Sequence, residues 1–115
     1  MKKKLFLFST LLLSIASCTF EKGEAPTLGC SVMSFSTDIQ PIINAKCATA
    51  GCHVSGGTGP GDFTLYLDLK GKIDGGIFKH RVFDLKDMPQ AGSPPLTEDE
   101  IHRLKCWVEQ GAPNN

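Results

Sequence analysis

After position 34, apolar and polar residues alternate with the period of an α-helix in two stretches, one near each end of that region. In the first stretch, Asp38 is placed to cap a helix that carries Pro41 in its first turn and leads into Cys47. The apolar face of this helix is made by Ile39, Ile42 and Ile43. The pattern predicts a short helix directly before the first of two closely spaced cysteines.

The second stretch, LTEDEIHRLKCWVEQGAP, has signals for both ends of a helix. Thr97 and Glu100 have the spacing of a capping box, and Gly111 followed by Pro113 predicts the end. The expected buried face consists of Ile101, Leu104 and Val108, with Trp107 alongside.

The middle of the chain is less regular. Residues 54–62 are rich in glycine and contain a proline, which excludes a regular element. Residues 63–69 alternate as a strand would, but a lone strand lacks a partner, so we expect a helix from Tyr66 to Asp74 instead. Residues 75–95 are predicted to be mostly loop. The fold class predicted by these elements is all-α, with about three short helices.

The first 17 residues have the pattern of an export signal. Three lysines precede an apolar run from Leu5 to Ile15, which is too short to span a membrane. The run ends in IASC, which resembles the bacterial lipoprotein box, where the cysteine becomes a lipid-carrying N-terminus. The resemblance implies a lipid on Cys18. The pattern predicts a signal peptide at 1–17, a tether at 18–29, which is polar and contains glycine and proline, and a folded domain at 30–115.

Loss of the signal would change the charge of the chain. The chain has 12 Lys and Arg and 12 Asp and Glu; three lysines lie in the signal, so 9 bases remain against 12 acids, a net charge of −3. No basic run is left to neutralise phosphates, so nucleic acid is not an expected partner. No Ser/His/Asp set, carboxylate pair or phosphate-binding loop indicates an enzyme.

The segment CATAGCH at 47–53 carries the most specific chemistry. In exported proteins, C-x-x-C-H marks covalent attachment of c-type haem, in which two thiols bind the porphyrin and the histidine ligates iron. Cys47 and Cys52 are two residues further apart than in that motif, but the small residues between them, among them Gly51, allow the chain to bulge. The pattern indicates haem bound by Cys47, Cys52 and His53.

Two other interpretations remain open on these residues alone. Cys47 and Cys52 could form a disulfide across a small loop, which would leave His53 on the surface. They could also bind zinc together with His53 and a fourth ligand, although thiolate sites are less common in exported proteins. The candidates for that fourth ligand are Cys106, His80 and His102.

From Phe35 to the C-terminus, the chain resembles the small haem-binding domains of the cytochrome c family found in bacterial envelope lipoproteins. The segments that carry the resemblance are FSTDIQPIINAKCATAGCH, GDFTLYLDLK, RVFDLKDMP and LTEDEIHRLKCWVEQGAP. It implies a cytochrome c-like fold around one covalent haem c, with thioethers at Cys47 and Cys52. His53 would be the proximal iron ligand and Met88 the distal one. The longer cysteine spacing also occurs in relatives of this type.

The sequence itself gives Met88 some independent support as a ligand. Met1 would leave with the signal, Met33 precedes the first helix, and Met88 lies in a turn fixed by its neighbour Pro89. Filling the core is the other interpretation of Met88. The rival sixth ligands, both expected to face water, are His80 and His102.

With lipid on Cys18 and haem on Cys47 and Cys52, the cysteines left over are Cys30 and Cys106. A disulfide between them would join the ends of the domain and stabilise it by roughly 4 kcal/mol in the loop-closure model.

The predicted function is electron transfer by a membrane-tethered, single-haem cytochrome c that contacts redox partner proteins in the cell envelope. Thr19 in place of an aspartate favours the outer membrane, by resemblance to known sorting rules. A disulfide-stapled interaction module without cofactor is the alternative from another class, with bridges Cys47–Cys52 and Cys30–Cys106. A haem-based gas sensor or peroxidase would need an open sixth position, against which Met88 argues.

Overall fold

The computed structural model describes residues 29–115. The predicted signal peptide, the predicted lipid attachment at Cys18 and all of the predicted tether except Gly29 lie outside the described residues. Residues 29–115 form helices and no strand, so this part of the chain is all-α as the sequence predicts. None of the helices in this range is long and apolar enough to cross a membrane.

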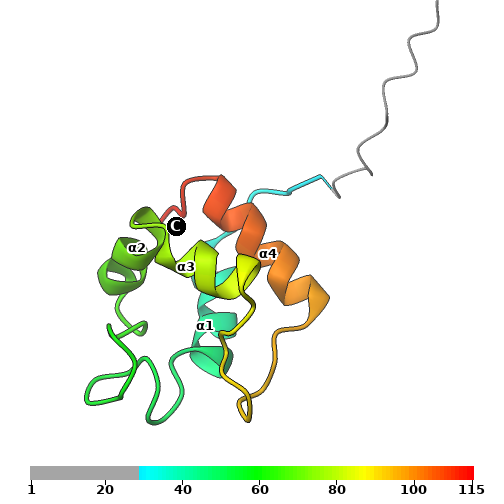
Figure 1. The fold of residues 1–115 in the computed structure, drawn as a ribbon. Helices are drawn as coiled ribbons and strands as arrows, with labels where there is room; N and C mark the ends of the chain where they lie inside the picture. Colours follow the sequence, from blue (N-terminus) through cyan, green and yellow to red (C-terminus); the bar gives the residue numbers. More distant parts are fainter. Residues whose placement is uncertain (1–28) are drawn as a thin grey trace, which may run out of the picture.

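The described residues contain four α-helices and two single turns of π-helix. In chain order they are η1 (Phe35–Ile39), α1 (Gln40–Lys46), α2 (Tyr66–Asp74), α3 (Ile77–Lys79), η2 (His80–Asp84) and α4 (Glu98–Glu109). Figure 1 shows the helices gathered at one end of the domain, while two long loops, one green and one gold, extend from the other end. The predicted count of about three helices is one too low, because α3 and η2 form an additional helix.

The first helix begins one turn earlier than predicted. Ser34 is its N-cap in place of Asp38, and the Ser34 hydroxyl accepts a hydrogen bond from the Thr37 N–H at 3.4 Å. The Ser34 N–H in turn donates to the Asp38 carboxylate at 2.8 Å, so Asp38 supports the cap from inside the helix. The turn η1 ends at Ile39, two residues before Pro41. Proline has no N–H, and in a regular helix its ring clashes with the carbonyl four residues back; a wider turn avoids this clash.

The middle of the chain is partly as predicted. Helix α2 has the predicted bounds, Tyr66–Asp74, and buries Leu69. The prediction of mostly loop for residues 75–95 is wrong for its first half, where α3 and η2 lie. Phe78 and Val82, one turn apart, are both buried in the core, and this burial stabilises a helix that has no capping signal in the sequence.

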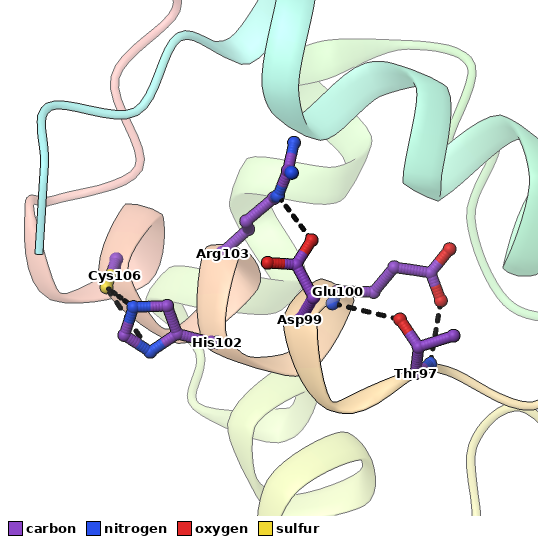
Figure 2. A network of polar contacts seen from close by, with 6 residues as sticks. All are labelled: Thr97, Asp99, Glu100, His102, Arg103 and Cys106. Carbon is purple, nitrogen blue, oxygen red and sulfur yellow. Dashed lines mark hydrogen bonds and ion pairs between the residues drawn. The ribbon is translucent and has the colours of Figure 1, made fainter. Parts of the chain in front are cut away.

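Helix α4 begins as predicted. The Thr97 hydroxyl accepts from the Glu100 N–H at 3.2 Å, and the Glu100 carboxylate accepts from the Thr97 N–H at 2.8 Å, which completes the capping box (Figure 2). The buried residues of this helix are Leu104, Cys106 and Trp107. Ile101 and Val108, predicted for the buried face, are only half-buried, because the face is turned towards Trp107.

Contacts between the first helix and α4 tie the two ends of the domain together. The predicted disulfide Cys30–Cys106 is present. Next to it, the ring of Phe35 stacks on that of Trp107 with 5.4 Å between their centroids. The side chain of Asn115 accepts from the Phe35 N–H at 2.8 Å, so the C-terminus covers the start of η1. The two ends of the described region, near Cys30 and at Asn115, are therefore fixed against α4 and η1, and the two long loops are left at the opposite end of the helices.

Candidate functional site

The segment CATAGCH forms a compact turn at the end of α1. Cys47 is the C-cap of α1, where its N–H donates to the Ile43 carbonyl at 2.8 Å. The His53 N–H then donates back to the Cys47 carbonyl at 3.2 Å, which closes the turn on itself. Gly51 has φ +79°, a left-handed conformation that glycine adopts without strain, as its place in the bulge predicts.

The glycine-rich loop folds back over this turn. Three backbone hydrogen bonds join the two segments, from Thr58 to Gly51 at 3.0 Å, from Gly59 to Cys52 at 3.2 Å and from Phe63 to His53 at 2.9 Å. Residues 54–62 are irregular as predicted, yet their backbone is fixed by specific bonds rather than left free. The loop therefore belongs to the wall of the site.

Two glycines allow the loop to come this close. A Cβ atom at Gly57 would lie 2.0 Å from the carbonyl oxygen of Cys52, a distance that backbone atoms cannot accept. A Cβ atom at Gly59 would lie 2.7 Å from Nδ1 of His53. The absence of side chains at both positions lets the loop pack directly on the cysteine turn and on the histidine ring.

The position of the His53 ring and its protonation state are both set by neighbouring residues. Its ring stacks on Phe63 with 4.1 Å between centroids and 4° between the planes. Burial lowers the pKa of His53; the carbonyls of Pro60 and Gly61 oppose this shift, and nearby positive charges add to it. The imidazole is therefore neutral at pH 7, the form that can bind a metal.

The Nδ1 atom of His53 is buried and has no hydrogen-bond partner among the described residues. A buried polar atom of this kind costs free energy unless a further group engages the ring.

Cys47 and Cys52 are both free thiols, the first buried and the second half-buried. Burial raises the pKa of Cys47 to about 12, and charge interactions with Cys52 and Glu100 act in the same direction. Cys47 is therefore protonated at neutral pH. The bridge Cys47–Cys52, on which the alternative of a stapled module without cofactor depends, is not formed.

These side chains line one cleft, with a volume of about 140 Å³. Cys47, Cys52 and His53 form part of its wall, and Met88 and Pro89 contribute another part from the loop after η2. The apolar lining is completed by Phe63, Ile77, Phe78 and Val82. The structure thus brings together the four residues that the sequence and its resemblance assign to haem: Cys47, Cys52, His53 and Met88.

The two histidines predicted as alternative ligands, and the other methionine of residues 29–115, lie outside the cleft. Met33 is buried in the core near the N-terminal end of η1 and does not line the cleft. His80 is exposed, as expected, and its Nδ1 lies 3.7 Å from Asp84. His102 was expected to face water but is half-buried, and its Nε2 lies 3.6 Å from the disulfide sulfur of Cys106 (Figure 2).

The zinc interpretation loses one of its possible ligands, because Cys106 is in the disulfide. Within residues 29–115, no three His, Cys, Asp or Glu side chains are grouped closely enough to hold a metal ion. The donor set at the cleft, with two free thiols, a neutral imidazole and a thioether, has the residue types that a covalently attached haem needs.

Sequence reasoning missed three parts of this site. It did not assign Phe63 to the histidine ring, although an aromatic residue directly after a glycine-rich loop is a usable signal. It gave no role to Gly57 and Gly59, since the contacts that need them are made with residues across the turn. It also overlooked three cations on the wall of the cleft, Lys46, Lys72 and Arg81.

Comparison of the chain with models of protein families, with curated proteins and with solved structures finds no match.

The close approach of loop and turn predicts that Gly57→Ala destabilises the protein. The added methyl group would meet backbone, so we expect a loss of about 1–3 kcal/mol in the free energy of unfolding, measured by urea denaturation. Gly71→Ala is the matched control, because Gly71 lies in α2 with open space around it, and alanine should stabilise the helix by up to about 1 kcal/mol. Equal stability of the two variants would show that the loop does not pack as described.

Proposed function

We propose that this protein is an electron-transfer protein, a small c-type cytochrome with one covalently attached haem. The observation that supports it most directly is the state of the four cysteines in residues 29–115. Cys30 and Cys106 are bridged, whereas Cys47 and Cys52 are free and lie beside His53 on one apolar cleft. An exported protein that leaves two neighbouring thiols unpaired needs a second use for them, and thioether bonds to a porphyrin provide one.

The proposal gives a role to the cysteines, the histidine, the methionine and the apolar wall of the cleft. Cys47 and Cys52 would hold the porphyrin edge, and His53 would bind iron, oriented by its stacking on Phe63. Met88 would bind iron as the second protein ligand, and the apolar wall would exclude water. When bound, the haem supplies an iron that gains and loses one electron. If His53 and Met88 both held the iron, no open position would be left for a substrate, which favours electron transfer over catalysis.

The proposal includes a lipid tether at Cys18. A lipidated cysteine would keep the cytochrome at the envelope membrane, near its redox partner proteins. Thr19 after that cysteine favours the outer membrane. Contact with such partners would be small and transient, as is usual for electron transfer.

The attachment of haem can be tested with two matched pairs of substitutions. The double variant Cys47→Ser, Cys52→Ser should lose haem when the protein is denatured and precipitated, because no thioether remains. The double variant Cys30→Ser, Cys106→Ser should keep it, although this variant is less stable. Visible absorption of the precipitated and redissolved protein is the measurement. Haem that stays with the first variant, or leaves the second, would contradict the assignment.

The role of Met88 as an iron ligand is tested by the visible absorption spectrum and the midpoint potential of its variants. A thioether stabilises ferrous iron relative to imidazole, so Met88→His should keep six-coordinate iron and lower the midpoint potential. Met88→Ala should bind carbon monoxide when reduced and lose the weak far-red band of a sulfur–iron bond. Met33→Leu is the control, because Met33 fills the core away from the cleft and a substitution of similar volume should leave the band intact. A band that disappears in Met33→Leu instead would move the ligand to Met33.

The tether is tested by Cys18→Ser. Because the proposed lipid lies outside the folded domain, this variant should move from the membrane fraction to the soluble fraction with its haem spectrum unchanged. Fractionation of cells followed by haem staining is the measurement. A variant that still sediments with membranes would show that the lipid on Cys18 is not what holds the protein there.

A further inference from the structure

The cleft carries positive charge only. Three cationic side chains line it, Lys46, Lys72 and Arg81, and no Asp or Glu does so. All three are half-buried, so water screens their charges less than it screens those of fully exposed side chains. Their effect on a group bound in the cleft depends on whether a carboxylate already balances each of them.

Two of the three cations are balanced by a carboxylate. Nζ of Lys46 lies 3.7 Å from the Glu100 carboxylate. Nε of Arg81 donates to both carboxylate oxygens of Asp87, at 2.7 and 2.9 Å. At longer range each of these pairs acts largely as a dipole, so its field within the cleft is weaker than that of an unpaired cation, although the charge of Arg81 still lowers the pKa of His53.

Lys72 is different, because it has no ion pair among residues 29–115. Asp68, one turn earlier on α2, is the obvious candidate partner. Its carboxylate instead accepts a hydrogen bond from the Asp62 N–H at 3.0 Å, and it is not paired with Lys72.

The side chain of Lys72 runs along the wall next to the proposed iron ligand. A Cβ atom built on Gly61 would lie 3.3 Å from Cε of Lys72 and 3.4 Å from the ring of Phe63. Phe63 is the ring on which His53 stacks. The one cation of the cleft without a carboxylate partner therefore lies close to the imidazole that would bind iron.

We infer that Lys72 is a tuning residue that raises the reduction potential of iron held by His53. Uptake of one electron removes one positive charge from the site, so a fixed cation nearby favours the reduced state over the oxidised state. This inference rests on the proposed function, since it concerns a haem in the cleft. It assigns Lys72 an electrostatic role, with no contact to the iron itself.

The test compares midpoint potentials, at low ionic strength, of wild type, Lys72→Gln, Lys72→Arg and Lys70→Gln. Lys70 lies on the same helix, pairs with Asp74 and does not line the cleft, so its substitution changes the net charge equally at a different place. We expect Lys72→Gln to lower the equilibrium constant for reduction by on the order of threefold. Lys72→Arg and Lys70→Gln should stay close to wild type, and added salt should reduce the difference.

The haem spectrum separates failure of the inference from failure of the proposed function. If the purified proteins contain haem with unchanged spectra, and Lys72→Gln has the potential of wild type or of Lys70→Gln, the role of Lys72 is overturned. If Lys72→Arg shifts the potential as much as Lys72→Gln, charge is not the cause and the inference is overturned as well. If wild type contains no haem, the proposed function fails and the inference fails with it.

Discussion

The candidate site depends on the direct contact between the backbone of the glycine-rich loop and the turn at the end of α1. Side chains at Gly57 and Gly59 would collide with the Cys52 carbonyl and with the His53 ring, so the contact exists only because these positions have none. It places Phe63 on the histidine and fixes both thiols at the edge of the cleft. A loop that looks unstructured in composition thereby determines the geometry of the cysteines and the histidine of the candidate site.

The remainder of the domain provides a rigid base for this contact. A chain of this size has a limited core, so the disulfide at Cys30 and the stacking of Phe35 on Trp107 do much to hold the first helix against α4. Because α1 ends directly at Cys47, the position of the first helix also sets the position of the cysteine turn. Stability at one end of the molecule and placement of the thiols at the other are thus coupled through a single short helix.

The sequence predicted those features whose signals are local. The capping box of Thr97 and Glu100 and the bounds of α2 could be read from neighbouring residues and are confirmed. The start of the first helix was misplaced, because Asp38 and Ser34 are both capable caps and the choice depends on a wide turn before Pro41. Helix α3 was missed because Phe78 stabilises it through burial against distant residues. The charges around the cleft were missed for the same reason, since Lys72 reaches Phe63 only in three dimensions.

The proposed function requires that Cys47 and Cys52 hold one haem while Cys30 and Cys106 form the one disulfide of the described residues. Intact mass spectrometry of protein without its lipid, under denaturing and non-reducing conditions, tests both halves at once. We expect the mass of the polypeptide plus one haem, with two hydrogens lost to one disulfide. A mass without haem and with four hydrogens lost, and peptide mapping that joins Cys47 to Cys52, would contradict it.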